Sequence, residues 1–196
     1  MTRTEHVVRG TVASDHIVQF FDSTASLADG VGAFLSPAFR QNAPCLIVAR
    51  PRHSKAIGRA LHTLGCSLAN AQRDGLLTIL DADTTLKEFM RDGRPDSMLF
   101  HQTVGALVEP LVKCGGQLRI YGEMVDMLAA QGNFHAAHCL EELWNQLARR
   151  LSFALLCGYS AAHFATDTTR ETLAAICREH TQVRLASDNA SSDKVA

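Results

Sequence analysis

Hydrophobic runs alternate with helical periodicity along this chain of 196 residues. Short apolar runs, which are typical of strands buried on both faces of a sheet, occupy residues 16–21, 45–49, 75–81, 118–123 and 154–158. Between these runs, apolar residues recur every three or four positions, which predicts helices at 24–39, 54–64, 83–90, 97–114, 140–148 and 168–180. Strands that alternate with helices in this way predict an α/β fold, with a mainly parallel central sheet and helices on both faces.

The same pattern sets the expected limits of the domain. Residues 1–14 show no periodicity, so we expect a flexible N-terminal arm. Residues 15–180 are expected to form a single domain, because a chain of this length suits one full core. Residues 181–196 are polar and poor in apolar side chains, which predicts a disordered tail.

Three local features interrupt the regular pattern. Residues 91–96 contain Gly93 and Pro95 and are predicted to be a loop. Pro110 lacks a backbone N–H, so it should bend or break the helix at 97–114. A short apolar turn is expected to join residue 125 to Gly132.

The helix at 140–148 carries one acidic residue in an unusual place. At about 100° per residue its apolar face consists of Leu140, Leu143, Trp144, Leu147 and Leu151. Glu141 projects to the edge of this face, which predicts a half-buried carboxylate. Such a group needs a partner, so Glu141 is expected either to pair with an arginine or to face a ligand. Glu123, at the end of a predicted strand, raises the same question.

Polar residues follow the ends of the predicted strands. In open parallel sheets, ligands bind at the carboxyl ends of the strands. The residues in or just beyond those positions are Asp22, Arg50, Asp81, Glu123 and Tyr159. We expect them to lie along one edge of the sheet if all five strands are parallel.

Composition excludes several classes of partner. The net charge is −1, and the densest basic group, residues 50–55, is too small to follow a nucleic-acid backbone, although it could hold one anion. We therefore expect no direct nucleic-acid partner. No apolar run of about 18 residues and no signal-peptide core occur, so we expect a cytoplasmic protein without a membrane partner.

Cysteine and histidine spacing predicts no metal centre. The six cysteines form no CxxC pair, which indicates reduced thiols in the core rather than disulfides. His135 and His138 lie three residues apart on a predicted helix, but no third ligand is near them in sequence. The sequence thus predicts neither a metal site nor a cofactor.

The usual catalytic motifs are absent from the sequence. The loop after the first strand, residues 22–26, has neither the glycines nor the lysine of a P-loop, so ATP hydrolysis of the Walker type is not expected. No GxSxG elbow occurs, and no Cys–His pair can be placed together. Glu123 and Glu141 could form an acid/base pair, but structural pairing with Arg50 or Arg119 explains them equally well. We predict no catalytic residues.

Several segments together resemble a known family. They are residues 16–22, 44–49, 121–125, Gly132–Asn133 and 140–145, within a match that covers roughly residues 15–164. This combination resembles the MEDS domain, the methanogen/methylotroph sensory domain of the DcmR type. The resemblance implies a degenerate RecA/KaiC-like fold without a Walker A loop. It further implies a role in signal transduction or transcription regulation, in which the domain senses a small ligand beside a partner such as a histidine kinase or a regulator.

The resemblance also implies which positions matter. The matching residues are His16, Phe21, Asp22, Glu123, Asn133, Glu141, Trp144 and Asn145. Phe21 stands where the family pattern leads us to expect a tyrosine, so any hydrogen bond through that hydroxyl is absent. Our predicted ligand-binding set consists of His16, Asp22, Arg50, Glu123, Asn133, Glu141, Trp144 and Asn145.

We therefore predict a non-catalytic sensory domain that binds a small ligand and signals through a partner protein or by self-association. Glu123 and Glu141 are expected to converge on one cavity above the sheet. Two alternatives stay open. The chain could be an interaction or dimerisation module in which these residues only fix the core, or a residual nucleotide-binding enzyme or hydrolase.

Overall fold

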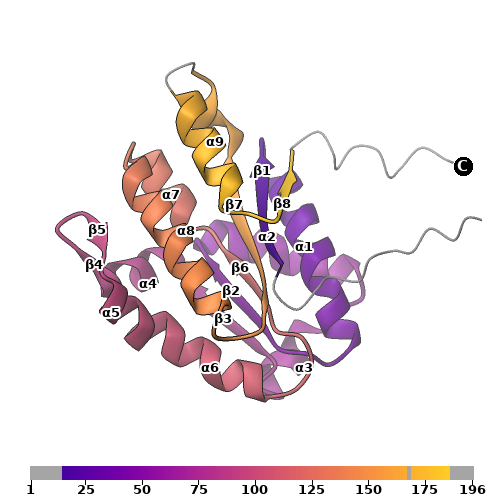
Figure 1. The fold of residues 1–196 in the computed structure, drawn as a ribbon. Coiled ribbons are helices and arrows are strands. Elements are labelled where there is room, and N and C mark those ends of the chain that lie inside the picture. The colour runs from indigo at the N-terminus through magenta and orange to yellow at the C-terminus, as the bar shows by residue number, and fades with distance from the viewer. Residues whose placement is uncertain (1–14, 167–168, 186–196) are drawn as a thin grey trace, which may run out of the picture.

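Six parallel strands form the central sheet of the part of the chain that the structure describes (Figure 1). The structure is a computed structural model, and it describes residues 15–166 and 169–185. In the order in which they pair, the strands are β3 (Leu77–Asp81), β2 (Cys45–Ala49), β6 (Arg119–Gly122), β7 (Ala154–Ser160), β1 (His16–Phe21) and β8 (Gln182–Arg184). The α/β fold with a parallel sheet is confirmed.

The middle strands are buried on both faces, as their apolar composition predicts. Every residue of β1, β2 and β6 is buried. Val18 and Phe20 of β1 belong to the core on one side of the sheet, while Ile17 and Phe21 belong to the core on the other. Alternation of side chains along the strands therefore divides the interior into two apolar layers.

Helices from the first half of the chain cover one face of the sheet (Figure 1). They are α1 (Thr24–Arg40) and α2 (Pro51–Thr63), with the short α3 (Leu68–Arg73) beside them. A Cβ atom added at Gly32 would lie 3.3 Å from the Ala60 Cβ, so the glycine allows α1 and α2 to pack closely. This face of the sheet therefore depends on contact between two helices as well as on strand burial.

Helices that follow β3 in the chain cover the opposite face (Figure 1). They are α4 (Ala82–Phe89), α5 (Ser97–Phe100), α6 (Ala106–Lys113), α7 (Met124–Ala130), α8 (Phe134–Ala148) and α9 (Arg170–Arg178). A 3₁₀ turn, Ala161–Phe164, follows β7. Leu140, Leu143, Trp144 and Leu147 of the predicted apolar face are buried, whereas Leu151 lies beyond α8 and is half-buried. Trp144 packs edge-on against Phe100, with ring centroids 5.3 Å apart.

The helix predicted at 97–114 is interrupted, but not at the expected position. A π-helical turn, His101–Gly105, separates α5 from α6, whereas Pro110 lies inside α6. The Thr103 hydroxyl donates hydrogen bonds to the carbonyl oxygens of Leu99 at 2.8 Å and Phe100 at 3.3 Å. A side chain that bonds to the preceding turn competes with the regular backbone ladder, which gives a physical reason for the wider turn.

Three short elements were missed because each is too short to show a clear period. Residues 124–130, predicted to be a turn, form α7, and α3 was not predicted at all. The predicted loop at 91–96 contains a small antiparallel hairpin, β4 (Met90–Arg91) and β5 (Arg94–Pro95). Its two-residue turn, Asp92–Gly93, has positive φ at both positions, as Asp-Gly turns favour.

The domain extends beyond residue 180, so the predicted tail began too early. Strand β8 pairs with β1 in parallel, with Val183 opposite Val18. The Thr181 hydroxyl donates to the His16 carbonyl oxygen at 2.9 Å and accepts from the His16 backbone N–H at 3.1 Å. The predicted arm, 1–14, and residues 186–196 of the predicted tail lie outside the described residues.

The cysteines are only partly in the core. All six cysteines are free, but only Cys45, Cys66 and Cys157 are buried, so the prediction that every one lies in the core was wrong. Cys114 is exposed at the end of α6. Burial raises the pKa of the Cys45 thiol to about 12.

Among the described residues, no helix has the length and apolar character needed to cross a membrane.

The buried position of Trp144 gives a direct test of the core. Trp144→Ala should lower the free energy of unfolding by about 3–5 kcal/mol, because it removes a large side chain from between Phe100 and Phe153. Urea denaturation followed by circular dichroism measures this change. The control Met98→Ala, at a residue 64% exposed, should change it by less than about 0.5 kcal/mol. Equal effects of the two substitutions would contradict the described core.

Candidate functional site

Two separate polar clusters are built around the two carboxylates that the sequence singled out. Glu141 projects from α8 into the layer that contains Cys157 and Tyr159 of β7. Glu123 lies at the end of β6, where it contacts Tyr121 on the opposite face of the sheet. Both acids are 0% exposed. The expectation that they converge on one cavity was therefore wrong.

The Glu141 cluster combines groups from four segments of the chain. Glu141 Oε1 accepts a hydrogen bond from the Tyr159 hydroxyl at 2.9 Å, and Oε2 accepts one from the Cys157 thiol at 3.2 Å. His16 Nε2 lies 3.2 Å from Glu141 Oε2 and 3.3 Å from Cys157 Sγ. His180 Nε2 lies 3.4 Å from Glu141 Oε1, without hydrogen-bond geometry.

The alternation of β7 explains why this cluster forms. Cys157 and Tyr159 are two residues apart and project to the same face of the sheet, together with Val18 and Phe20 of the neighbouring β1. Helix α8 packs on that face and directs Glu141 at them. The same face therefore carries an apolar core with a polar centre.

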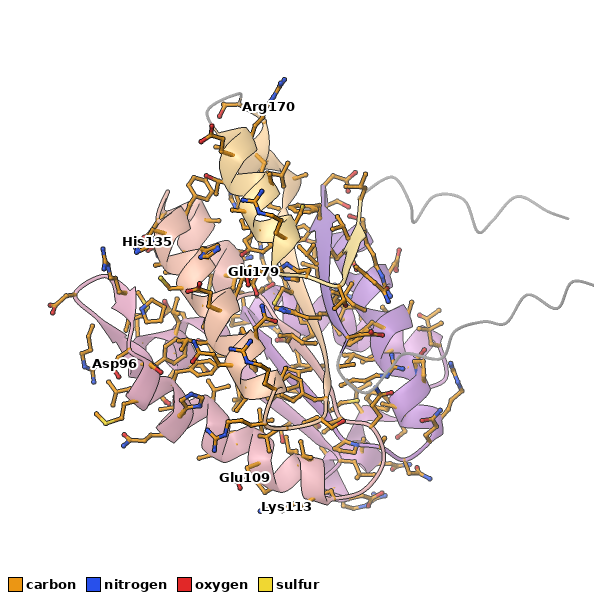
Figure 2. All side chains as sticks on the ribbon, in the orientation of Figure 1. Asp96, Glu109, Lys113, His135, Arg170 and Glu179 are labelled. Carbon is orange, nitrogen blue, oxygen red and sulfur yellow. The ribbon has the colours of Figure 1, made fainter. Side chains whose placement is uncertain are left out.

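Asn145 links this centre to the C-terminal segment. Asn145 lies one helical turn after Glu141 on α8, and its Oδ1 accepts a hydrogen bond from His16 Nδ1 at 2.8 Å. Its Nδ2 donates to Glu179 twice, to the backbone oxygen at 3.1 Å and to Oε2 at 2.9 Å. Figure 2 shows Glu179 at the end of α9, beside α8. Residues 179–181 are thus attached to β1 and α8 by side-chain bonds.

Electrostatics fix the protonation states in this cluster. Burial alone would raise the pKa of Glu141, but the positive charge of His180 and the bond from His16 lower it below its usual range. Burial lowers and Glu141 raises the pKa of His180, with a net increase. Burial and the nearby carboxylate raise the pKa of both Cys157 and Tyr159. The carboxylate is therefore ionised, while the thiol and the phenol keep their protons.

The Glu123 cluster lies at the carboxyl edge of the sheet. Glu123 Oε1 accepts from the backbone N–H of Arg50 and from its Nε at 2.9 Å. Its Oε2 accepts from the Tyr121 hydroxyl at 3.1 Å and contacts His53 Nδ1. Arg50 also bonds to Asp126 through Nη2. One arginine therefore joins two carboxylates.

Asp126 connects this network to the end of β7. It accepts a hydrogen bond from the Ser160 backbone N–H at 2.7 Å, and its Oδ1 lies 3.0 Å from His163 Nε2. Asp126 is 1% exposed, whereas the side chains of Arg50 and His163 are 25% and 23% exposed. Beside β2, β6 and β7, the edge therefore has partly exposed basic groups, whereas the carboxylates of Glu123 and Asp126 are buried.

Internal partners neutralise Glu123. Burial raises the pKa of Glu123, but the bond to His53 and the charge of Arg50 lower it by more. The net pKa is therefore below the usual range. Burial lowers the pKa of Arg50, and Glu123 and Asp126 raise it, with a net increase. Burial and Glu123 raise the pKa of Tyr121. At neutral pH the ionised Glu123 carboxylate therefore lies against the charged Arg50 guanidinium.

The structure separates the remaining predicted residues from both carboxylates. Asp22 is exposed and accepts a hydrogen bond from the Ser26 hydroxyl at 2.7 Å, which lowers its pKa. Asn133 caps α8 by accepting from Ala136 N–H and donates to the Gly93 carbonyl oxygen at 2.8 Å. Trp144 lies in the apolar core. The structure thus gives Asn133 and Trp144 structural contacts.

Both acids have partners within the chain. Glu123 pairs with Arg50, one of the two arginines that the sequence offered as structural partners. Glu141 is fully buried rather than half-buried, and its charged partners are histidines rather than an arginine. Arg119 donates to the Phe34 carbonyl oxygen at 2.7 Å instead. A histidine far away in sequence cannot be assigned to Glu141 from helix periodicity alone.

Sequence reasoning missed several members of the two clusters. These are His53, Tyr121, Asp126, Cys157, His163 and His180. A usable signal existed for Cys157, because alternation along β7 places it on the same face as Tyr159, which the strand-end rule had selected. No comparable signal existed for His180, which follows a helix with no predicted relation to Glu141.

The loop after β1 cannot hold a phosphate in the manner of a P-loop. Ser23 and Ser26 form a capping box at the start of α1, so the Ser23 hydroxyl already accepts from the Ser26 backbone N–H. Asp22 adds negative charge at the position where phosphate charge would have to lie. This observation supports the sequence-based exclusion of Walker-type chemistry.

Known proteins match both the sequence and the fold. A sequence model of the MEDS family, described as the methanogen/methylotroph, DcmR sensory domain, matches residues 15–181. A solved KaiC-like protein from the archaeon Pyrococcus horikoshii OT3 is similar, with a TM-score of 0.52 and 13% identity over 87% of this chain and 71% of the archaeal chain. No curated protein matches this chain.

The fold and the structural neighbour define a RecA-like α/β domain. Within that class, the chain belongs to the MEDS family, because the family model covers most of its length. The resemblance inferred from sequence is confirmed. Membership in a family of sensory domains indicates a sensory or regulatory role.

The lowered pKa of Glu123 predicts a pH-dependent effect of Glu123→Gln. A carboxylate whose pKa is lower in the folded state stabilises the fold above its unfolded pKa, and this contribution is lost as pH falls through the folded value. The variant should lose about 3–5 kcal/mol of unfolding free energy at pH 7, because it breaks a buried ion pair.

Urea denaturation at several pH values measures this effect. The difference between wild type and Glu123→Gln should shrink as pH falls from the unfolded pKa of about 4.3 toward the lower pKa of the folded state, because the wild-type carboxylate then takes up a proton. Glu88→Gln, at an exposed residue of α4, is the control and should show little difference at any pH. A difference for Glu123→Gln that stays constant with pH would contradict this assignment.

Proposed function

We propose that this chain is a non-catalytic sensory domain that binds a small ligand at the carboxyl edge of its sheet. The domain then signals ligand binding to a partner protein, such as a histidine kinase or a regulator, or to a second copy of the chain. The observation that carries the proposal is the neutralised part of the edge beside β2, β6 and β7: Glu123 and Asp126 are buried and paired there, while Arg50 and His163 remain partly exposed.

The strand order supports one continuous binding edge. β2, β6, β7 and β1 are neighbours in the sheet and run in the same direction. Their carboxyl ends are followed by Arg50, Glu123, His163 and Asp22 respectively. Ligands of open parallel sheets bind at this end of the strands. The proposed site therefore occupies the place where related folds bind ligands, with a different set of side chains.

The charges at this edge favour recognition over catalysis. A general base must be free to take a proton, but Glu123 is held by Arg50, His53 and Tyr121. Asp126 is likewise occupied by Arg50 and His163. These networks orient the two basic side chains, which can donate hydrogen bonds to an oxygen atom of a ligand.

Arg50 has donor capacity left for such a ligand. Its Nε and Nη2 point inward to the two carboxylates, while Nη1 has no bond to another of the described residues. A guanidinium held from two sides presents its remaining donors in a fixed direction, so less entropy is lost on binding. This favours a small ligand that carries an oxygen acceptor.

The sensing proposal is tested first by searching for the ligand. Mass spectrometry of the denatured protein identifies molecules that copurify, and calorimetry then measures the affinity of each candidate. His163→Ala should weaken binding of the identified ligand by up to about tenfold, because a hydrogen bond contributes about 0.5–1.5 kcal/mol. His62→Ala, at an exposed histidine of α2, is the matched control and should bind as wild type does.

The alternatives predict other outcomes. A pure interaction module would show no ligand in either measurement and would bind its partner at full affinity alone. A residual nucleotide-binding enzyme would bind ATP with magnesium at millimolar concentration. Equal ligand affinity of His163→Ala and wild type would contradict the proposed edge site.

A further inference from the structure

The Glu141 cluster contains four donor atoms that together fit a metal ion. These are one nitrogen each from His16 and His180, one oxygen from Glu141 and the sulfur of Cys157, all within 4.8 Å of one another. Imidazole nitrogen, thiolate and carboxylate are the ligands that zinc takes in proteins. The cluster lies on the face of the sheet opposite Tyr121, away from the binding edge proposed above.

The outer hydrogen bonds turn both imidazole rings toward this centre. The Ile176 carbonyl oxygen can only accept, so His180 Nδ1 donates to it, at 2.7 Å. Asn145 uses its Nδ2 as a donor to Glu179, so its Oδ1 must accept from His16 Nδ1. Both rings therefore have Nε2 directed inward, in the arrangement that metal-binding histidines adopt when their other nitrogen is held by an oxygen.

One buried atom in the cluster lacks a hydrogen bond. The His180 side chain is 0% exposed, and its Nε2 has no hydrogen-bond partner although it lies 3.4 Å from Glu141 Oε1. A buried polar atom without a partner costs free energy. His180 Nε2 thus points at the centre of the cluster, where its ion pair with Glu141 is its one interaction among the described residues.

We propose that His16, Glu141, Cys157 and His180 bind one divalent transition-metal ion of the zinc class. This site is independent of the small-ligand site at the sheet edge, so either can exist without the other. The sequence alone suggested only His135 and His138 as a metal-binding pair, and that pair lacks a third ligand.

The charges select a divalent ion. With the Glu141 carboxylate and the Cys157 thiolate as ligands, a 2+ ion makes the buried site neutral, whereas monovalent and trivalent ions leave net charge in an apolar layer. Binding displaces the thiol proton, together with any proton on the inward nitrogens of His16 and His180, and these protons pass to solvent. The nitrogen and sulfur donors exclude magnesium and calcium as natural occupants.

The distances also suit such an ion. Bonds of about 2.0–2.3 Å in a tetrahedral zinc site hold the ligand atoms roughly 3.3–3.8 Å apart. His16 Nε2 is already 3.2 Å from Glu141 Oε2 and 3.3 Å from Cys157 Sγ. The largest distance between any two of the four ligand atoms must shorten by about 1 Å. Rotation of the side chains can supply this change. Tyr159 holds the carboxylate in place by donating to its other oxygen.

Metal binding at this site would fix the C-terminal segment. His180 lies between α9 and β8, separated from α9 by Glu179 and from β8 by Thr181, and β8 is an edge strand of three residues. The other three ligands belong to β1, α8 and β7. A metal ion would therefore join residues 170–184 to the body of the domain at one point, so that metal occupancy controls how firmly this segment is attached.

The test uses the full chain, freed of metal by a chelator and then titrated with zinc or cobalt chloride alone. We expect one ion per chain by elemental analysis after removal of excess metal. The cobalt form should show the charge-transfer absorption of a thiolate–cobalt bond and the visible bands of tetrahedral coordination. The melting temperature should rise on addition of either metal.

Variants distinguish this site from surface binding. Cys157→Ser should abolish the charge-transfer band, while Cys45→Ser, at an equally buried cysteine of another strand, should retain it. Asn145→Ala should weaken metal affinity by about tenfold to a hundredfold, because it releases the His16 ring. His135 is exposed on the outer side of α8 (Figure 2), so His135→Ala should bind metal as wild type does.

Two results would overturn the proposal. The first is a wild-type chain that takes up no stoichiometric zinc or cobalt. The second is a thiolate–cobalt charge-transfer band that persists in Cys157→Ser or disappears in His135→Ala. Should Cys157→Ser fail to fold, His180→Gln serves in its place, because it leaves the strand intact, and unchanged cobalt affinity in that variant would be equally contradictory.

Discussion

A carboxylate that is fully buried in an apolar layer must be neutralised by the protein itself, and Glu141 imposes this constraint on distant parts of the chain. Its partners come from β1, β7 and the residue that follows α9. The constraint therefore explains why α9 and β8 are part of the domain rather than a tail. It also explains how a sheet face made of apolar side chains tolerates a polar centre.

Glu123 obeys the same rule on the other side, with a different result. Its partners are Arg50 and His53, whose helix covers the face opposite α8. This network ends at partly exposed basic groups, whereas its acids are buried. The RecA-like fold of this chain lacks a P-loop after β1, where Ser23 and Ser26 instead form the capping box of α1, and the family to which the chain belongs is one of sensory domains.

The sequence predicted what depends on local pattern. Five parallel strands, the long helices and the buried face of α8 follow from periodicity, and Arg50 follows from the strand-end rule. The β8 strand and His180 could not be found in this way, because three residues show no period and contacts between distant segments leave no trace in spacing. The sequence identified Glu141 as an unusual residue of α8. Its full burial depends on the segments that cover α8, and helix periodicity gives no information about those segments.

Hydrogen exchange of the metal-free chain tests most directly whether Glu141 holds the C-terminal segment. In Glu141→Gln, amides of residues 170–184 should exchange faster than in wild type, while those of β2 and β6 should keep their protection, because local opening is governed by local contacts. Uniform acceleration over the whole sheet, or unchanged exchange at 170–184, would contradict the account.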